Sequence, residues 1–438
     1  MKKVITYGTY DLFHNGHYNM LKRAKEYGDY LIVGVTGENY DVGRGKLSVK
    51  DSLATRIENV QKTGLADEII VEEYLGQKIG DIVRYGVDVL VIGDDWKGKF
   101  DHLSRYCDVV YLERTKGISS TQLREERFAK RIIGIVTDFP DDNRLLSEAR
   151  AINEFELRYV YTENKKAASV FPEEYPDCTV VDSYDSLLDA SDIIYVHSIP
   201  PHNTEYIRKA LEHGKHVIYD PPATLSRVEM EELYALAKKM HVVLISNIKM
   251  VHIHVFNQML WMTQGGLIGD IVSFNSSISR IDYNMGNIFY NLLTIALCPM
   301  IKVLGTNYLE KDIMIKTDEN GVQFASLSFL YPNTRATINV GNRTRVRNRL
   351  EIIGTEGTVH QDGNWWRGSY FEIDKPENDA QELYNTNYSG NGFKYLLRAI
   401  ETMITNDRLE SMGLFEDESL AIVEILEAVR EIETAGTR

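Results

Sequence analysis

Close to its N-terminus the sequence reads Gly8-Thr9-Tyr10-Asp11-Leu12-Phe13-His14-Asn15-Gly16-His17. The short, β-branched run at residues 4–7 precedes it and predicts a buried strand. Residues 18–24 follow it and carry an apolar face at helical spacing, which predicts a helix. A strand, a tight turn and a helix in that order direct backbone N–H groups and a helix N-terminus at one point. This arrangement suits a phosphate group.

Two histidines in this stretch carry the chemical argument. His14 and His17 are three residues apart, so a helix that begins near Phe13 places both on the same side of its first turn. Two imidazoles beside N–H donors can neutralise a triphosphate as charge shifts during a reaction. The alternative is that they are capping or core histidines. The density of His, Gly and Asp in one short stretch favours a nucleotide site.

Length and composition set broad limits. A chain of 438 residues predicts two or three domains. The net charge of −15 argues against a broad surface for nucleic acid or an anionic membrane, so local Arg, Lys and N–H groups must hold negative substrates. The three cysteines are isolated, which predicts neither disulfides nor a protein metal site. There is no signal segment and no apolar run of ~18 residues, so we expect a cytoplasmic protein.

Apolar runs at residues 30–35, 68–71, 87–93 and 109–112 alternate with helical patterns. This alternation predicts a doubly wound parallel sheet with ligands at the carboxyl ends of its strands. Gly93 and Asp94 follow one such strand, and residues 114–121 follow another. Arg114 can hold phosphate oxygens with two parallel hydrogen bonds. Lys46 lies in a glycine-rich basic loop that either closes over phosphates or is a solvated turn.

Four motifs in this order resemble those of glycerol-3-phosphate cytidylyltransferases, within the wider group of HxGH nucleotidyltransferases. They are GTYDLFHNGH at 8–17, RIENV at 56–60, GDDWKGKFD at 93–101 and RTKGISSTQL at 114–123. The resemblance implies transfer of CMP from CTP to an alcohol phosphate, with release of pyrophosphate and with Mg²⁺ present. The attacking group is already a phosphate oxygen, so catalysis consists of alignment and charge stabilisation.

The resemblance also assigns roles to residues. It implies that catalysis depends on His14, His17, Lys46 and Arg114. It implies nucleotide binding by Thr9, Tyr10, Phe13, Gly93, Asp94, Thr115, Gly117, Ile118, Ser119 and Ser120. On the acceptor side it implies Asp11, Glu38 and Arg56. Glu38 stands where the family has aspartate, and this departure leaves two acceptors open. Glycerol phosphate is the first expectation, and another small polyol phosphate is the second.

The rest of the chain predicts two further domains. A charged run at 124–130 ends the first domain, which we place at 1–127. A second alternation of strands and helices predicts a Rossmann-like domain at 131–250. Long alternating strands begin at residue 271 and predict a large, open, mainly antiparallel sheet with one covered face. We therefore expect an α+β domain at 251–438, and an α/β class for the whole chain.

This second part resembles the family of glucose-fructose oxidoreductase and inositol dehydrogenase. The supporting segments are ALEHGKHVIYDPPATL at 210–225, EELYALAKK at 231–239 and LEIIGTEGTVHQDG at 350–363. The resemblance implies NAD(P), but three departures oppose its use. The turn at 137–143 has no glycine and holds three carboxylates, which repel a pyrophosphate. Pro221 occupies the place of the family's lysine, and its Asp-x-x-x-His pair is not evident in 287–297.

These departures favour a degenerate oxidoreductase scaffold, with NAD(P) binding still possible. The alternative is a bifunctional enzyme whose C-terminal half reduces a keto-sugar phosphate with NAD(P)H to the polyol phosphate that the first domain uses. His202 and Asn203 match a substrate-side turn in that case, and Lys249 or His252 could supply a proton. Trp365 and Trp366 either stack a ligand or cap the sheet.

The expected partners are CTP and a small polyol phosphate, without nucleic acid or membrane. An open sheet of this size also predicts a homo-oligomer. The expected product is CDP-glycerol or a related CDP-polyol, for a cell-surface polymer such as teichoic acid or capsule.

Overall fold

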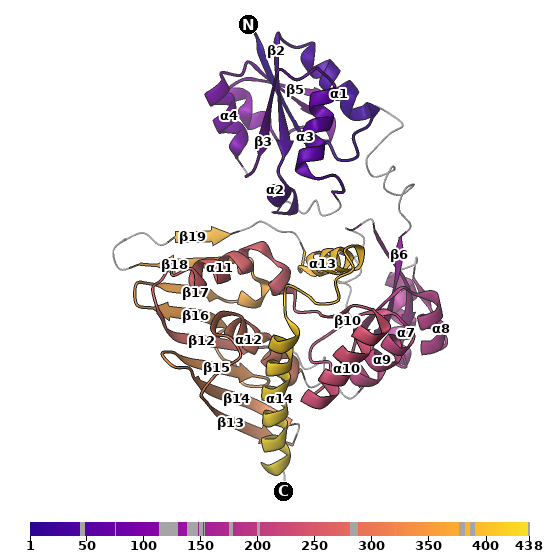
Figure 1. The fold of residues 1–438 in the computed structure, drawn as a ribbon, viewed down its shortest axis with the longest axis vertical. Coiled ribbons are helices and arrows are strands. Elements are labelled where there is room, and N and C mark those ends of the chain that lie inside the picture. The colour runs from indigo at the N-terminus through magenta and orange to yellow at the C-terminus, as the bar shows by residue number, and fades with distance from the viewer. Residues whose placement is uncertain are drawn as a thin grey trace. The chain divides into compact units, whose positions relative to one another are not determined.

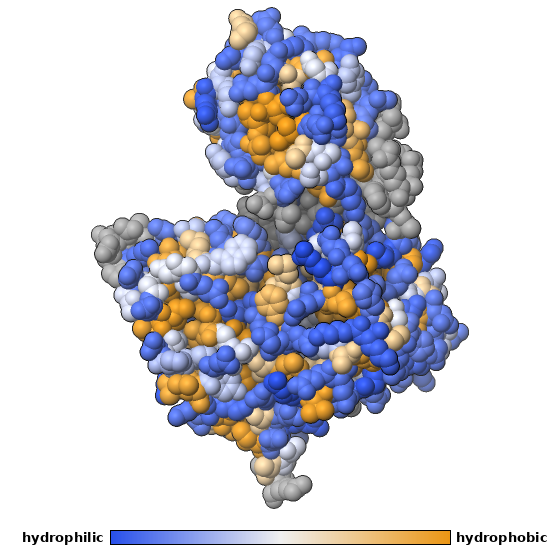
Figure 2. Space-filling view, in the orientation of Figure 1, coloured by the Kyte–Doolittle hydropathy of each residue, from blue (hydrophilic) through white to orange (hydrophobic). Residues whose placement is uncertain are grey.

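The computed structural model describes residues 1–43, 49–74, 76–113, 130–137, 148, 152, 154–174, 178–198, 202–280, 288–319, 321–375, 382–385 and 390–436. The chain forms two compact units, Met1–Lys130 and Arg131–Arg438. On the face shown in Figure 2, hydrophilic residues cover most of the surface of both units and smaller hydrophobic groups interrupt them. Among the helices of the described ranges, none combines the length and apolarity that crossing a bilayer requires.

The first unit contains one parallel sheet with the strand order β3-β2-β1-β4-β5. Its strands are β1 (Lys3–Gly8), β2 (Tyr30–Thr36), β3 (Glu68–Glu72), β4 (Val89–Gly93) and β5 (Asp108–Leu112). Its helices are α1 (Asn15–Lys25), α2 (Glu38–Gly43), α3 (Leu53–Lys62) and α4 (Gln77–Tyr85), with short 3₁₀ turns η1 (Asp94–Trp96) and η2 (Asp101–Arg105) (Figure 1).

The apolar run of β1 explains why this strand lies at the centre of the sheet. Val4 packs against Leu21 of α1 on one face, whereas Ile5 packs against Leu90 in a second core on the other face. A strand buried on both faces requires a continuous apolar sequence, which β1 has. The order of strands reverses between β1 and β4, so their carboxyl ends form the crevice in which such sheets bind ligands.

The second unit begins with a parallel sheet of order β11-β10-β9-β6-β7-β8. Its strands are β6 (Arg131–Thr137), β7 (Phe155–Tyr161), β8 (Thr179–Val180), β9 (Ile193–His197), β10 (His216–Tyr219) and β11 (Leu244–Ser246). The helices of this layer are α7 (Lys165–Glu174), α8 (Tyr184–Ala190), α9 (His202–Glu212) and α10 (Arg227–Met240).

An eight-stranded sheet of order β13-β14-β15-β12-β16-β17-β18-β19 completes this unit. Its strands are β12 (Ile271–Ser279), β13 (Glu310–Asp318), β14 (Gly321–Leu330), β15 (Arg335–Gly341), β16 (Arg349–Gly354), β17 (Thr358–Asp362), β18 (Tyr370–Asp374) and β19 (Glu382–Asn385). The remaining elements are η3 (Lys249–His252), α11 (His254–Gln264), α12 (Phe289–Leu304), η4 (Trp365–Arg367), α13 (Phe393–Thr405) and α14 (Glu416–Gly436).

The large sheet is antiparallel except where β12 pairs with β15. Helices α11, α12 and α14 lie against one face, as Figure 1 shows, and their apolar side chains form one core with the strands. The predicted class is therefore confirmed: a parallel-sheet domain, a Rossmann-like sheet and a mainly antiparallel open sheet with one covered face.

Candidate functional site

The two histidines of the first motif lie together at the start of α1. The helix begins at Asn15, two residues later than the sequence predicts, because His14 is its N-cap with an extended backbone. The His14 Nδ1 atom accepts a hydrogen bond from the Gly16 N–H at 3.0 Å. The imidazoles of His14 and His17 are stacked, with 3.9 Å between ring centroids and 19° between planes.

The N-cap bond also decides which nitrogen of His14 carries a proton. In a neutral imidazole one nitrogen accepts and the other donates. Because the Nδ1 atom of His14 accepts from the backbone, the Nε2 atom is the N–H donor. The side chain therefore presents a donor, the group that an anionic oxygen needs, at the N-terminus of a helix.

The turn between β1 and α1 is held in an unusual conformation. Tyr10 and Leu12 have left-handed backbone angles, with φ of 56° and 46°. Such residues cost on the order of 1–3 kcal/mol each and concentrate at functional sites. Burial of the Tyr10 ring offsets this cost, because the ring packs edge-on against His17 at 5.5 Å between centroids. A Cβ atom at Gly8 would come within 2.9 Å of the Tyr10 ring.

Asp11 fastens this turn to the segment before α3. Its Oδ1 atom accepts hydrogen bonds from the N–H groups of Lys50 and Asp51, each at 2.9 Å. Asp51 returns the contact, because its Oδ2 atom accepts from the Leu12 N–H at 2.9 Å. Asp11 is buried, and the contacts described for it hold the position of the histidine-bearing turn.

Arg56 is a fully buried cation that joins two strand ends. One terminal nitrogen donates to the carbonyl oxygen of Thr9, which follows β1, at 3.0 Å, and to that of Thr36 in β2 at 2.7 Å. The same nitrogen lies 3.4 Å from the carboxylate of Asp41. The Nε atom donates to the carbonyl oxygen of Asp51 at 3.1 Å. The guanidinium thus fixes the carboxyl edge of the sheet.

The other predicted residues are distributed as follows. Thr9 is buried and its hydroxyl donates to Asp41 at 3.1 Å, while Phe13 packs beside His17 at 5.5 Å between centroids. Gly93 ends β4 and Asp94 begins η1, on the same edge of the sheet as Thr9. Glu38 accepts a hydrogen bond from the Leu53 N–H at 3.0 Å, at the start of α3. Seven predicted contacts lie outside the described residues: Lys46, Arg114, Thr115, Gly117, Ile118, Ser119 and Ser120.

A cleft of about 500 Å³ opens at the carboxyl ends of β1 to β4. Gly8 and Thr9 border it, and Lys78, Lys99 and His102 add basic groups to its wall. None of the three predicted acceptor-side residues lines it. The sequence analysis predicted a role for neither Lys78 nor Lys99. Lys99 lies inside the quoted motif at 93–101, and its spacing from Asp94 was the available signal.

Lys78 is a buried cation in the wall of this cleft. Its ammonium pairs with the carboxylate of Glu72 and lies 4.3 Å from the centroid of the Tyr7 ring. Tyr7 in turn donates to Asp81 at 2.8 Å. Burial, followed by the hydrogen bond to Asp81, raises the pKa of Tyr7, so its hydroxyl stays protonated. Glu72 lines the same cleft, so the wall here carries a buried ion pair, and Lys99 and His102 are the further basic groups beside it.

In the second unit, polar side chains gather at the carboxyl ends of three neighbouring strands. His197 ends β9, Asp220 follows β10 and Asn247 follows β11. The Asp220 carboxylate pairs with the Nδ1 atom of His197, and it accepts from the Tyr195 hydroxyl at 2.7 Å and from Asn247 at 2.8 Å. The sequence analysis did not predict this cluster. The available signal was that each of its residues lies at the end of a strand or directly after it.

Asn203 supports the same edge from the start of α9. Its amide donates to the carbonyl oxygens of Asp220 at 3.1 Å and Pro222 at 2.9 Å. Its neighbour His202 is exposed, and Lys249 and His252 belong to η3. Trp365 is buried and donates to the Ser277 carbonyl oxygen at 2.9 Å, so this residue belongs to the core of the large sheet.

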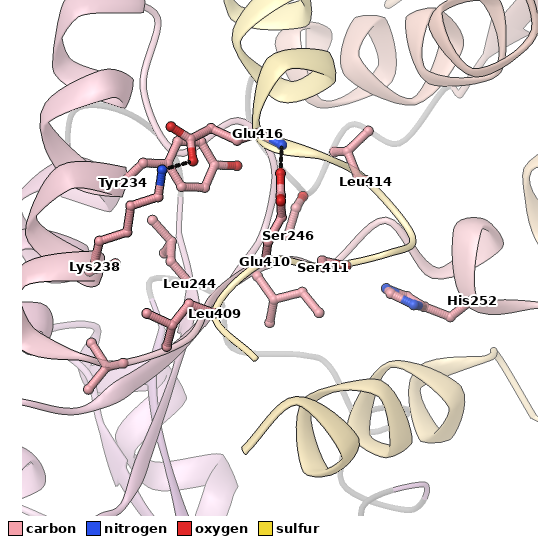
Figure 3. Close-up of a pocket in the computed structure, with 13 residues that line it drawn as sticks. Tyr234, Lys238, Leu244, Ser246, His252, Leu409, Glu410, Ser411, Leu414 and Glu416 are labelled. Atoms are coloured by element: carbon pink, nitrogen blue, oxygen red, sulfur yellow. Dashed lines mark hydrogen bonds and ion pairs between the residues drawn. The ribbon is translucent and has the colours of Figure 1, made fainter. Parts of the chain in front are cut away.

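A second cavity lies between α10, β11 and residues 409–416 (Figure 3). Its volume of about 50 Å³ is room for water, not for a nucleotide. Lys238 and Glu416 pair at 2.5 Å on one side of it, and His252 lies on the other. Burial, and then the charge of Lys302, lowers the pKa of His252 to about 4 from its ordinary 6.5.

This shift predicts a loss of stability in mild acid. Between pH 6.5 and 4 the unfolded chain binds a proton at His252 that the folded chain does not, so stability falls as the pH falls through this window. The contribution is on the order of 3 kcal/mol. We expect the acid-induced decrease in melting temperature to be smaller in His252→Gln than in wild type. The exposed His213→Gln serves as the control, and equal pH profiles for all three proteins would contradict the prediction.

Comparison with protein-family models places two families along the chain. Residues 5–126 match the model described as cytidylyltransferase-like, and residues 132–248 match that of the oxidoreductase family with an NAD-binding Rossmann fold. The fold, the paired histidines and the first match define the N-terminal unit as a nucleotidyltransferase.

Comparison with curated relatives identifies the family to which the N-terminal unit belongs within this class. The chain is 51% identical over 126 residues to glycerol-3-phosphate cytidylyltransferase of Bacillus spizizenii, which covers 29% of this chain and 97% of the relative. It is 45% identical over 130 residues to the enzyme of the same name from Staphylococcus aureus, and this match covers 30% of this chain and 98% of the relative. Through its N-terminal unit the chain belongs to the glycerol-3-phosphate cytidylyltransferase family.

Solved structures share the fold of the second unit. A 3-ketoreductase from Actinomadura kijaniata, solved with NADP and TDP-benzene, matches with a TM-score of 0.59 at 21% identity, covering 69% of this chain and 98% of that one. UDP-N-acetylglucosamine 3-dehydrogenase from Acidithiobacillus ferrooxidans matches with a TM-score of 0.58 at 16% identity. This match covers 70% of this chain and 99% of that one. The second unit thus shares the fold of these two structures over nearly their whole length.

Proposed function

We propose that the N-terminal unit transfers CMP from CTP to glycerol 3-phosphate or a related small polyol phosphate. The products are CDP-glycerol, or another CDP-polyol, and pyrophosphate, and they would serve synthesis of a cell-surface polymer. The observation that carries the proposal is the stacked pair His14 and His17 beside a strained turn, in a unit related over its full length to glycerol-3-phosphate cytidylyltransferases.

In this mechanism an oxygen of the acceptor phosphate bonds to the α-phosphorus of CTP as the bond to the pyrophosphate oxygen breaks. The Nε2 donor of His14, with His17 beside it, stabilises the charge that develops on the α-phosphate oxygens. Asp11 and Arg56 keep the turn in position through their backbone contacts. Lys46, Arg114 and the segment with Thr115, Gly117, Ile118, Ser119 and Ser120 complete the proposed phosphate and nucleotide contacts.

Magnesium enters this scheme with the nucleotide. Among the described residues no group of three or more His, Cys, Asp or Glu side chains is placed to hold a metal ion. Mg²⁺ is commonly bound through substrate phosphates and one or two carboxylates. We therefore propose that it is bound mainly by the triphosphate, whose charge it would partly neutralise.

The test is pyrophosphate release by the full chain with CTP and a panel of glycerol 3-phosphate, ribitol 5-phosphate and erythritol 4-phosphate. We expect release only when CTP and one of these acceptors are both present. Silence across the whole panel would overturn the proposal, as would a preference for ATP or GTP.

We place the acceptor in the cleft that contains Lys78. The cleft borders Thr9 and Gly8 beside the histidine-bearing turn, and three basic side chains, Lys78, Lys99 and His102, line it with one carboxylate, Glu72. We expect Lys78→Met to raise the KM for the polyol phosphate about tenfold or more, with little change in the KM for CTP, because a charge-assisted hydrogen bond is worth roughly 1.5–3 kcal/mol.

The control for this prediction is Lys97→Met, which removes an exposed charge outside the cleft. Because Lys78→Met leaves Glu72 buried without its partner, the paired variant Lys78→Met with Glu72→Gln tests the same effect without an uncompensated charge. Equal acceptor KM values in wild type and both Lys78 variants would place the acceptor elsewhere.

A second candidate function concerns the C-terminal unit. We propose that it reduces a keto-sugar phosphate, or a related polyhydroxy ketone, to the polyol phosphate that the first unit consumes. The cluster around Asp220 favours this, since it lies at the edge where Rossmann-like sheets bind ligands. A nicotinamide nucleotide, when bound, would supply the hydride.

The described residues offer groups for such a cofactor or its substrate. The Oδ1 atoms of Asn203 and Asn247 are buried and accept no hydrogen bond within the described part of the chain. A buried oxygen without a donor costs free energy, which a ligand N–H or O–H group would recover. Quenching of protein fluorescence by NADH and NADPH tests the fit. Absence of binding of both would overturn this second proposal.

A further inference from the structure

The cleft in the first unit is larger than a three-carbon acceptor needs. Residues at the carboxyl ends of four neighbouring strands, β3, β2, β1 and β4, line it, and its volume is about 500 Å³. Neighbouring strands lie about 4.8 Å apart, so four strand ends span roughly 14 Å. Sites of this volume commonly hold ligands of the size of a drug molecule.

Glycerol 3-phosphate would fill only part of this length. Its phosphate must lie beside the turn that follows β1, where His14 and His17 stand, because that phosphate attacks the nucleotide. Lys78 reaches the same region, with its ammonium 4.3 Å from the centroid of the Tyr7 ring in β1. With carbon–carbon bonds of about 1.5 Å, an extended glycerol 3-phosphate spans roughly 7 Å, and each further carbon adds about 1.3 Å. About half of the cleft length is therefore left for a longer chain.

Gly76 keeps the wall beside Lys78 open. It lines the cleft as the N-cap of α4 with a φ of 93°, and a Cβ atom there would meet no heavy atom within 4 Å. Ile79 lines the cleft from the first turn of the same helix, and its side chain is half-buried. The size of the residues at these two positions therefore affects how much of the cleft a ligand can occupy.

The remaining wall suits the carbon chain of a polyol. Trp96 and Phe100 pack together with 5.8 Å between ring centroids, and Trp96 is 38% exposed. The Lys99 ammonium lies 5.0 Å from the centroid of the Trp96 ring, and the His102 ring lies 6.4 Å from that of Phe100. A polyol chain presents C–H groups, which pack on aromatic rings, and hydroxyl groups, which form hydrogen bonds with such basic side chains.

We propose that the acceptor is an acyclic polyol phosphate of four or five carbons, longer than glycerol 3-phosphate. Its carbons beyond the third would lie along the wall formed by Trp96 and Phe100, in the space that Gly76 leaves open. The inference deepens the proposed cytidylyltransferase function and rests on it. The bonds that form and break at phosphorus are the same, and only the chain that the cleft holds is longer.

The experiment measures kcat/KM for pyrophosphate release by the full chain at saturating CTP. The acceptors are glycerol 3-phosphate, erythritol 4-phosphate and ribitol 5-phosphate. We expect kcat/KM to rise about threefold with each added carbon, and so about tenfold over the series, because each carbon taken out of water contributes binding energy of that size.

Two variants narrow the cleft, and a third is the matched control. Gly76→Asn and Ile79→Phe should lower the ratio of kcat/KM for ribitol 5-phosphate to that for glycerol 3-phosphate to about threefold or less. Asparagine is chosen because it tolerates a positive φ and is a good N-cap. Gly80→Asn makes the same exchange at an exposed position of α4 outside the cleft and should keep the tenfold ratio. The ratio is the readout because general damage to the fold would lower both values alike.

The outcomes separate this inference from the function on which it rests. A wild-type kcat/KM for glycerol 3-phosphate equal to or above that for ribitol 5-phosphate would overturn the inference and leave the cytidylyltransferase function standing. An unchanged ratio in both Gly76→Asn and Ile79→Phe, with melting temperatures near that of wild type, would overturn the placement of the longer chain in this cleft. Pyrophosphate release with none of the three acceptors would overturn the proposed function together with the inference.

Discussion

Removing either imidazole of the HxGH motif should lower CMP transfer by about a hundredfold to a thousandfold, the effect of deleting one preorganised donor to a developing charge. The two rings are stacked at the N-terminus of α1, so each contributes where the α-phosphate charge would develop. The measurement is the initial rate of pyrophosphate release at saturating CTP and acceptor for His14→Asn and His17→Ala.

His14→Asn is chosen because His14 also caps the helix. Asparagine is a good N-cap, so it can replace the bond to the Gly16 N–H while it removes the imidazole, whereas alanine would also cost about 1 kcal/mol of helix stability. Asn15→Ala, an exposed position of the same turn, is the control. A near wild-type rate of pyrophosphate release in His14→Asn would show that His14 acts as a capping residue and not in catalysis.

Replacing Arg56 should unfold the carboxyl edge of the first sheet. Arg56→Met leaves Asp41 buried without its cation and leaves the Thr9 and Thr36 carbonyl oxygens without a donor, and breaking a buried ion pair costs about 3–5 kcal/mol. Hydrogen exchange measured by mass spectrometry on the full chain should show lost protection in β1, β2 and α3. Arg105→Met, at an exposed position, is the control.

The same experiment distinguishes support from acceptor binding. If Arg56 contacts the acceptor directly, Arg56→Met should raise the acceptor KM while hydrogen exchange in β1 and β2 stays as in wild type. The bonds of Arg56 to two strand ends predict the opposite, namely lost protection together with weaker binding of both substrates.

Much of the fold could be predicted because its periodic patterns are local. The apolar run of β1, buried on both faces, requires a central parallel strand, and the spacing of His14 and His17 requires that they share a helical turn. The positive φ angles of Tyr10 and Leu12 could not be predicted. They arise because packing of the Tyr10 ring on His17 and the bonds of Asp11 to a distant segment offset the backbone strain.

The cleft and the Asp220 cluster were missed for a related reason. Lys78 lies in the first turn of α4 and pairs with Glu72, six positions earlier at the end of β3, and nothing in the local pattern distinguishes it from a solvated lysine. His197, Asp220 and Asn247 are 23 and 27 residues apart in successive strand ends, so only the register of β9, β10 and β11 brings them together.

By itself the sequence determined the order of the domains, the parallel and antiparallel character of their sheets and the nucleotide chemistry of the first motif, because hydrophobic period and motif spacing act over a few residues. The tertiary structure alone decided which polar groups meet. It assigned Arg56 to two strand ends, placed Lys78 in the wall of a cleft and set His197 against Asp220. Those contacts depend on strand register and on the loss of water around charges. Neither can be predicted from the spacing of neighbouring residues.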